Sequence, residues 1–419
     1  MNTEARTGGP AAQEAEPAAA HPARAFPLPP PGGMGPPAEY AELQQGCPVA
    51  RVRAIHDVPG LDTTGWFVTR YDDVRDLLAD PRLIRPDVND WPVTPDDWPR
   101  IEPDMVTLME LEGEEHAALR RAVADAFSVR AVRGHAERIR GIADELLDAL
   151  EEGGGPADLV AGFTEPFPIR VMCEITGIPY AGHETFTRLS KHLLFSVDLD
   201  DDDDDITQVM RDLVLEWIAL RRREPGDDVL TDLIGRCDAG ELTEEDVVRF
   251  GRSMIIAGFL PSTMFLGNAA LALLTRPDTA SALRADPGLM PGAVEELLRH
   301  LPVLNGNVLQ LATEDIEVGG QAIRAGELVI PVIAAANRDP SVFPDPGRLD
   351  LSRIDNPHLA FGRGTHNCLG AHLTRTKFAI GLGRLLERFP ELRLAVGEDE
   401  IPWPSGRKFS SPLALPVRW

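Results

Sequence analysis

The sequence is short of several features that mark other classes of protein. No segment approaches the ~20 uninterrupted apolar residues of a membrane-spanning helix. The first forty residues lack the basic start and apolar core of a secretory signal. Positive charge is scarce, and the formal net charge of −26 argues against nucleic acid or an anionic membrane as a partner, because binding phosphates requires a basic face. We therefore expect a soluble, cytoplasmic protein that binds neither nucleic acid nor a membrane.

Cysteine and lysine are also rare. The four cysteines are Cys47, Cys173, Cys237 and Cys368. Their spacing fits neither a metal-binding cluster nor a disulfide framework, which is typical of a reducing compartment. Lysine occurs only three times, and we draw no function from that scarcity. A special role for any one cysteine has to be argued from its own surroundings.

The chain nevertheless has enough apolar material for a large core, since 43% of its residues are hydrophobic. Residues 1–37 are different, because Pro, Ala and Gly dominate them and cannot bury enough apolar surface to offset the entropy of ordering. We expect a disordered tail over 1–37, followed by a single domain over 38–419. The acidic run Asp200–Asp205 is expected to be a solvated loop.

Apolar residues recur at helical spacing over most of the remaining chain. The expected helices are Asp72–Asp80, Glu114–Phe127, His135–Glu152, Phe167–Thr176, Ile206–Arg223, Glu244–Thr275, Thr279–Asp286 and Ala293–His300. The expected strands are Trp66–Tyr71, Ile316–Val318, Leu328–Ile333 and Leu413–Val417. Between them, Pro81–Pro103 is rich in Pro, Asp and Trp and predicts a long irregular loop, a feature that is usually functional in compact enzymes. The sequence thus predicts a mainly α fold with small β-sheets.

The most informative segment is a glycine-rich loop, Phe361-Gly-Arg-Gly-Thr-His-Asn-Cys368-Leu-Gly370, which runs into an apolar-periodic helix. At a helix start the dipole and the free backbone N–H groups lower the pKa of a thiol and hold a thiolate. A thiolate of this kind can ligate a haem iron. Gly362, Gly364 and Gly370 would let the backbone approach a flat macrocycle. The alternative is a buried structural cysteine.

This loop resembles the haem-binding signature of the cytochromes P450. The matching residues, in order, are Phe361, Gly362, His366, Cys368 and Gly370. The resemblance implies that Cys368 ligates the iron of haem b (iron protoporphyrin IX), and that Phe361 packs near the sulfur. It also implies that Gly370 lies against the haem, and that His366 and Arg363 lie near a haem propionate or the face that meets a redox partner.

The resemblance continues over nearly all of the chain after the tail. Glu296-Leu-Leu-Arg299 matches the family's Glu-x-x-Arg helix, whose two ends lie one turn apart on one face. It is followed by Ala336–Pro340, Phe343–Pro346 and Leu349–Arg353, in the order that the family uses. By this resemblance Arg353 completes a structural Glu-Arg-Arg lock beneath the cysteine loop.

Upstream, His116 and Arg120 stand four residues apart on one face of a predicted helix. They are similar to the family's pair that binds haem propionates; the alternative is a solvated surface pair. One departure lies at Gln310, where many family members have another propionate-binding arginine. The haem would then depend more on His116, Arg120 and His366.

A second departure lies in the long helix expected above the haem. Ala257 and Gly258 match the family's Ala-Gly, but the usual acid–alcohol pair is replaced by Leu260 and Pro261. Pro261 should preserve or sharpen the kink of this helix. Protons must then come through the next residue, Ser262, through ordered water or through a polar group of the substrate. We expect Ala257 to contact the haem and Gly258, Pro261 and Ser262 to be the catalytic positions; the alternative is a kink alone.

Several functions follow from these resemblances. The long helix, the segment Gly292–Arg299 and the Leu-Pro-Val-Arg-Trp ending are similar to a branch that couples or dimerises cyclodipeptides (diketopiperazines). We therefore expect oxidative C–C or C–N coupling in secondary metabolism. The alternatives are hydroxylation of a polyketide, terpene or macrolide, a peroxide-driven peroxygenase, and a haem protein that binds a ligand without turnover. A peroxygenase would need an arginine beside Pro261, where Leu260 and Ser262 stand instead.

The resemblance also implies partners and a substrate pocket. We expect ferredoxin and ferredoxin reductase as electron donors, a small-molecule substrate and a monomer. By family analogy the pocket is built from Pro81–Pro103, 206–223, Ala257–Ser262, Val303–Val308 and Phe409–Ser411.

Overall fold

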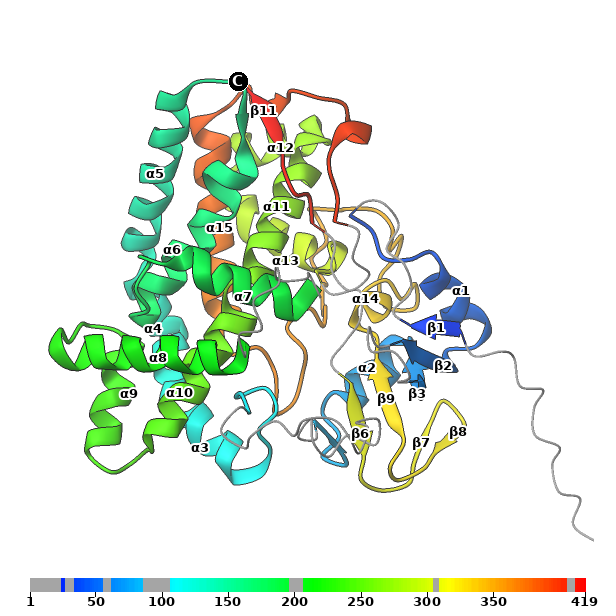
Figure 1. The fold of residues 1–419 in the computed structure, drawn as a ribbon. Coiled ribbons are helices and arrows are strands. Elements are labelled where there is room, and N and C mark those ends of the chain that lie inside the picture. The colour runs from blue at the N-terminus through cyan, green and yellow to red at the C-terminus, as the bar shows by residue number, and fades with distance from the viewer. Residues whose placement is uncertain are drawn as a thin grey trace, which may run out of the picture.

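The computed structural model describes residues 24–26, 34–55, 62–85, 106–195, 206–303, 309–404 and 411–419. A large helical body occupies one side of the molecule and a smaller sheet-rich part occupies the other (Figure 1). This arrangement confirms the predicted mainly α fold with small sheets. The acidic run at 200–205 and the part of the predicted loop beyond Arg85 lie outside the described residues.

The longer helices make up the helical body. They are α3 (Gly113–Ala124), α5 (Ala136–Gly153), α6 (Pro166–Thr176), α7 (His183–Phe195), α8 (Ile206–Arg223), α9 (Val229–Asp238), α10 (Glu244–Ser253), α11 (Leu260–Leu274), α12 (Pro277–Ala285), α13 (Met290–His300) and α15 (Ala371–Arg388). The shorter ones are α1 (Glu39–Gly46), α2 (Tyr71–Leu77), α4 (Val129–Gly134) and α14 (Ile333–Ala336). All the helices expected from apolar spacing are present, whereas α1, α4, α7, α9 and α14 were not predicted.

The segment expected to form one helix from Glu244 to Thr275 is divided in the structure. α10 ends at Ser253, Met254–Gly258 form a π-helical turn, and α11 begins at Leu260 with Pro261 in its first turn. Proline has no backbone N–H and clashes with the preceding turn, so the regular hydrogen-bond ladder cannot pass it. The predicted interruption beside Pro261 is therefore confirmed.

The same stretch is long and apolar enough to cross a membrane by length and composition alone. It covers the 31 residues Glu244–Leu274, and 78% of its most apolar window is buried inside the protein. A helix that is buried to this extent is typical of the core of a soluble protein.

The largest sheet has six strands in the order β1-β2-β3-β9-β6-β4. Their bounds are β1 Arg24–Phe26, β2 Val49–Ile55, β3 Asp62–Val68, β9 Leu328–Pro331, β6 Gln310–Ala312 and β4 Leu83–Ile84. The two smaller sheets are β10 (Arg393–Leu394), β11 (Pro416–Arg418) and β5 (Ala157–Asp158), and the hairpin β7 (Ile316–Val318) and β8 (Gln321–Ile323). The predicted strand at 66–71 ends earlier, at Val68, because Tyr71 already begins α2.

The strand β1 lies inside the tail that the composition predicts to be disordered. Residues 24–26 pair in parallel with residues 52–54 of β2, so this short piece of the tail is placed by strand pairing that composition does not reveal. Residues 1–23 and 27–33 lie outside the described residues.

The helix α15 runs through the helical body beside α5 and α13 (Figure 1). Its packing is close, because a Cβ atom at Gly381 would lie 2.6 Å from a ring carbon of Phe167 on α6. On another face, Phe378 of α15 stacks on Phe265 of α11 with ring centroids 4.4 Å apart. These contacts fix α15 against α6 and against the divided helix.

Candidate active site

The predicted Glu-Arg-Arg lock is present and buried. The Arg299 guanidinium donates from Nη2 to Glu296 Oε1 (2.7 Å) and from Nε to Glu296 Oε2 (2.8 Å). Arg353 donates from Nε to the same Oε2 atom at 3.1 Å. The side chains of Glu296, Arg299 and Arg353 are 1%, 0% and 8% exposed. Two guanidinium groups thus neutralise one carboxylate that water cannot reach.

The lock also fastens the chain that leads toward the cysteine loop. The remaining N–H groups of Arg299 donate to three backbone carbonyls, those of Asn337 (2.9 Å), Pro346 (2.9 Å) and Arg348 (3.1 Å). Glu296 Oε1 accepts from the backbone N–H of Asp350 at 2.9 Å. One buried ion pair therefore holds several turns of irregular backbone, which confirms the structural role that the resemblance implied.

A second carboxylate, Glu295, joins α13 to the helix after the cysteine loop. Its oxygens accept from Arg375 (Nε, 2.7 Å) and lie 3.1 Å from His358 Nε2. Burial raises the pKa of Glu295, but the bonds to His358 and Arg375 outweigh it and hold that pKa at about 2. The Arg375 guanidinium in turn lies 4.4 Å from the centre of the Phe361 ring. Phe361, expected beside the sulfur, is thus placed by a contact that the sequence did not predict.

The loop from Phe361 to Cys368 is closed by its own backbone. Cys368 N–H donates to the carbonyl of Phe361 at 2.8 Å. Gly362 (φ +69°) and Gly364 (φ +74°) adopt the left-handed backbone that glycine allows. A Cβ atom at Gly364 would lie 2.5 Å from the carbonyl oxygen of Leu78. We expected Gly364 to serve the approach of a macrocycle; the structure instead shows that it lets the loop pack on the chain after α2.

The environment of the Cys368 thiol differs from the prediction. α15 begins at Ala371 with Gly370 as its cap, so Cys368 precedes the helix rather than opening it. Burial raises the pKa of Cys368, and the N–H of Gly370 and the positive charges of Lys377, Arg120 and Arg375 only partly offset this. The predicted lowering of this pKa is wrong, because desolvation of a thiolate outweighs one N–H group and charges at a distance.

The residues around Cys368 fit a haem. The residue is exposed, although protein surrounds its sulfur closely enough for burial to raise the thiol pKa. A thiol that faces an open space bounded by protein would have both properties, the exposure and the raised pKa. A Cβ atom at Gly370 would meet nothing closer than Thr374 Oγ1 at 3.9 Å, and one at Gly362 would meet nothing closer than 4.0 Å. There is room for a flat group against this face of the loop.

The three predicted propionate ligands come together beside the loop. The rings of His116 on α3 and His366 have centroids 4.4 Å apart. Arg120, one turn after His116, donates from Nη2 to the carbonyl of Asn367 at 2.6 Å. His366 Nε2 lies 3.0 Å from Glu112 Oε1. The sequence did not identify Glu112, whose carboxylate would compete with a propionate for His366.

His116 is the most deeply buried of these three. It is 1% exposed, and its Nδ1 atom has no hydrogen-bond partner among the described residues. Burial, followed by the charges of His366 and Arg120, lowers its pKa to about 4, so the ring is neutral near pH 7. An unpartnered buried nitrogen is costly, and a propionate oxygen is the type of partner that would satisfy it as an acceptor.

Gln310 and Arg363 are the two other positions that the resemblance related to the haem propionates. Gln310, on β6, is 6% exposed, and its Oε1 atom is buried without a hydrogen-bond partner in the described part of the chain. As a neutral amide it cannot supply the charge of the arginine that it replaces. Arg363 is exposed on the loop.

Residues at the break between α10 and α11 differ in how exposed they are. Ala257 is exposed, and Gly258 and Pro261 are half-buried, although the elements around them are buried. Leu260 is buried and packs against Met264 and Val303. The predicted haem-contacting and catalytic positions Ala257, Gly258 and Pro261 are therefore accessible, whereas the residue at the position of the acid is not.

Ser262 is the one predicted catalytic residue with a charged partner. Its Oγ atom accepts from Lys377 Nζ at 2.7 Å, and both residues are buried. Sequence reasoning missed Lys377. The available signal was a lysine at an apolar-periodic position of the helix after the cysteine loop, in a chain with only three lysines.

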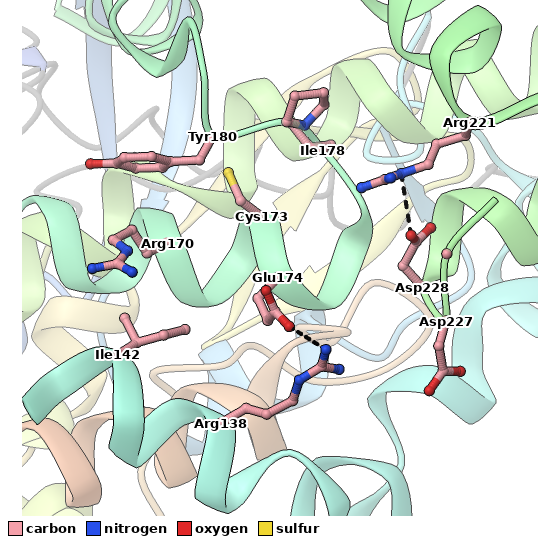
Figure 2. A pocket seen from close by; sticks show the side chains of 12 residues that line it. Arg138, Ile142, Arg170, Cys173, Glu174, Ile178, Tyr180, Arg221, Asp227 and Asp228 are labelled. Atoms are coloured by element: carbon pink, nitrogen blue, oxygen red, sulfur yellow. Dashed lines mark ion pairs between the residues drawn. The ribbon is translucent and has the colours of Figure 1, made fainter. Parts of the chain in front are cut away.

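A separate cavity of about 420 Å³ lies between α5, α6, the end of α8 and the chain before α9 (Figure 2). Arg138 pairs with Glu174 at 2.6 Å and Arg221 pairs with Asp228 at 3.2 Å on its wall. None of the predicted haem-binding or catalytic residues lines this cavity, although Arg221 belongs to 206–223, one of the segments expected to form the substrate pocket. Its ion pairs satisfy each other, so we do not assign the substrate to it. The expected pocket segments 86–103, 304–308 and 409–410 lie outside the described residues.

Comparison with known proteins identifies the family. The model of the cytochrome P450 family matches residues 288–410. Mycinamicin IV hydroxylase/epoxidase of Micromonospora griseorubida is 38% identical over 401 residues, which cover 94% of this chain and 98% of that protein. Nocardicin C N-oxygenase of Nocardia uniformis subsp. tsuyamanensis is 39% identical over 385 residues, which cover 91% and 94%.

The fold is shared with solved structures as well. The LnmA cytochrome P450 hydroxylase from the leinamycin biosynthetic pathway of Streptomyces atroolivaceus S-140 superimposes with a TM-score of 0.82 at 39% identity, covering 94% of this chain and 100% of that one. These names describe hydroxylases and oxygenases. They do not show the cyclodipeptide branch, and they support the hydroxylating alternative over our expectation of oxidative coupling.

Because the similarity extends over whole chains at this level of identity, the cofactor of the family applies to this chain. That cofactor is a haem whose iron is held by a cysteine thiolate. The lock, the glycine-rich cysteine loop and the divided helix are the local features through which this chain matches that chemistry. The chain belongs to the cytochrome P450 family and is a monooxygenase of the bacterial type.

Proposed function

We propose that this chain is a hydroxylating haem-thiolate monooxygenase that acts on a small secondary metabolite of the polyketide or macrolide class. The observation that carries the proposal is its whole-length similarity to proteins named as hydroxylases and oxygenases, together with Cys368 facing an open space. Names such as mycinamicin IV hydroxylase/epoxidase support this substrate class for the present chain. We place the activity in a single catalytic domain over 38–419, working as a monomer in the cytoplasm.

In this proposal Cys368 supplies the thiolate that holds the iron. His116, Arg120 and His366 hold the propionates, as their common position beside the loop supports. Gly370 and Ala257 leave room for the macrocycle on its two sides, and Phe361, held by Arg375, shields the sulfur. When bound, the haem supplies the activation of dioxygen that a protein side chain cannot perform.

The chain's own residues would position the substrate and deliver protons. Gly258 and Pro261 lie on the accessible side of the interruption, where a substrate carbon could approach. The side chain of Leu260 is aliphatic and cannot donate a proton, and it packs into the core rather than lining a polar route. Ser262 is the hydroxyl that follows Pro261 and takes the place of the missing alcohol. A hydroxyl of this kind can pass one proton at a time to an acceptor within hydrogen-bond reach.

Electrons would come from ferredoxin and ferredoxin reductase, as is general for bacterial members of the family. A peroxide-driven route has less support, because no arginine stands beside Pro261 to anchor a carboxylate. The exposed Arg363 supports a docking face for an acidic ferredoxin on the loop side.

The test compares the wild-type protein with Cys368→Ala. We expect the wild type to give the thiolate-type reduced carbon monoxide band, and the variant to lack it. With ferredoxin, its reductase and NADPH, the wild type should add one oxygen atom to a macrolide or polyketide substrate found by spectral binding screens. Equal turnover by peroxide alone would favour the peroxygenase. Coupled cyclodipeptide products would restore the coupling hypothesis and overturn the proposed substrate class.

A further inference from the structure

Lys377 is an unusual residue for the interior of a helical protein. It lies on α15 nine residues after Cys368, is 1% exposed and ranks among the largest fully buried side chains. Among the described residues it has no carboxylate partner, and its recorded hydrogen bond goes to Ser262 Oγ at 2.7 Å. Lysine is almost never fully buried without a partner, so this position calls for a reason beyond packing.

In this bond Lys377 Nζ is the donor and Ser262 Oγ is the acceptor. An ammonium group has donors only, so Ser262 Oγ must be the acceptor and its own proton remains available. Burial lowers the pKa of Lys377 to about 7, and the Cys368 thiolate opposes this by favouring the charged form.

The neighbouring hydroxyls behave differently. Thr263, the next residue, donates its hydroxyl proton to the carbonyl of Leu260 at 2.9 Å. Ser253, at the end of α10, and Thr275, directly after α11, donate theirs to backbone carbonyls of their own helix turns at 2.6 and 3.0 Å. Helical serine and threonine usually do this. Within the described part of the chain, the Ser262 proton has no such acceptor.

We propose that Lys377 is a positioning residue that holds Ser262 as a free hydrogen-bond donor at the break beside Pro261. The ammonium occupies a lone pair of Oγ and keeps the hydroxyl from folding back onto its own helix. Its proton then points to whichever acceptor stands in the space that the proposed function assigns to the haem ligand and the substrate. This inference rests on that proposed function, and it identifies the residue that compensates for the missing acid–alcohol pair.

The test uses the haem-loaded full chain and four variants. Lys377→Met keeps the length of the side chain and removes its donors, and Ser262→Ala removes the hydroxyl. The double variant tests whether the two act together. Thr263→Ala is the matched control, because it removes an adjacent hydroxyl, also 8% exposed, whose proton is committed to its own helix.

The first measurement is the C–O stretching frequency of the reduced carbon monoxide complex, which responds to a hydrogen-bond donor near the ligand. We expect Lys377→Met and Ser262→Ala to shift it in the same direction, with no further shift in the double variant and none in Thr263→Ala. The second measurement is peroxide released per product formed. It should rise roughly tenfold in both single variants, the factor expected from losing one hydrogen bond during the reaction.

Two results would overturn the inference. One is a Lys377→Met protein that loses only thermal stability while its C–O stretch and peroxide release match the wild type, which would make the lysine structural. The other is a Ser262→Ala protein that is unchanged in both measurements, and this result does not depend on whether Lys377→Met folds. Absence of the thiolate-type band in the wild type would instead refute the proposed function itself.

Discussion

Replacing Arg299 by methionine should unfold much of what surrounds the cysteine loop. Methionine keeps most of the aliphatic length but removes every donor of the guanidinium. Glu296 would lose its two bonds to Arg299, and the carbonyls of Asn337, Pro346 and Arg348 would lose their donor. Glu296 would keep its bonds from Arg353, the Asp350 N–H and the Asn356 amide, so its charge would be only partly compensated.

The structure allows the cost to be estimated. Removing one partner of a buried ion pair costs ~3–5 kcal/mol, and each buried carbonyl left without a donor adds ~1–3 kcal/mol when the backbone cannot relax. These terms overlap, so we expect a loss of at least ~5 kcal/mol in the free energy of unfolding. That is comparable to the lower end of the ~5–15 kcal/mol by which whole domains are stable. Arg299→Met should therefore be recovered in low yield and with little haem.

The assay is urea unfolding followed by circular dichroism, together with haem content per mole of protein. Arg324→Met is the control, because Arg324 pairs with Asp315 where the two side chains are 68% and 59% exposed. That variant should stay within ~0.5 kcal/mol of the wild type. The reasoning is refuted if the Arg299 and Arg324 variants unfold at the same urea concentration with equal haem content.

Three further predictions follow from the site. Cys368→Ser should bind haem weakly and lose the thiolate-type carbon monoxide band, because a serine oxygen is a much poorer donor to iron; an unchanged spectrum would contradict the ligand assignment. Glu295→Gln should be less stable than the wild type mainly at higher pH. The folded pKa of Glu295, about 2, lies below the ordinary value of 4.5. The ionised carboxylate therefore stabilises the fold above pH ~4.5, and this contribution is lost as the pH falls toward ~2. Thermal unfolding from pH 7 to 3 checks this, since a gap between wild type and variant that does not narrow would be inconsistent with it. Gly364→Ala should cost ~1–3 kcal/mol, because its φ of +74° is strained for alanine and the new Cβ would meet Leu78 O at 2.5 Å, whereas Gly347→Ala, with nothing within 4 Å, should unfold like the wild type.

The sequence by itself determined the family, most helices and the cysteine loop. These features depend on residues close together in the chain: Gly362 permits a local left-handed turn, Pro261 interrupts a helix, and Glu296 meets Arg299 one turn later. Local geometry decides each of these three features, so periodicity and spacing were sufficient for them, whereas the family was indicated by the resemblance of the cysteine loop to the haem-binding signature. We did not predict α7 and α9, although apolar residues recur at helical spacing in both. The strand β1 was not predicted because its pairing with a distant segment leaves no local pattern.

Only the tertiary structure decided how the site is supported. Lys377 and Ser262 are 115 residues apart, and Gly364 meets the chain after α2, so neither contact has a local signature. The pKa of Cys368 was predicted with the wrong sign for the same reason: a helix end is visible in the sequence, whereas desolvation depends on all the atoms that surround the thiol. Burial and long-range pairing arise when helices pack against one another. The pattern of residues along the sequence does not show which helices will pack together.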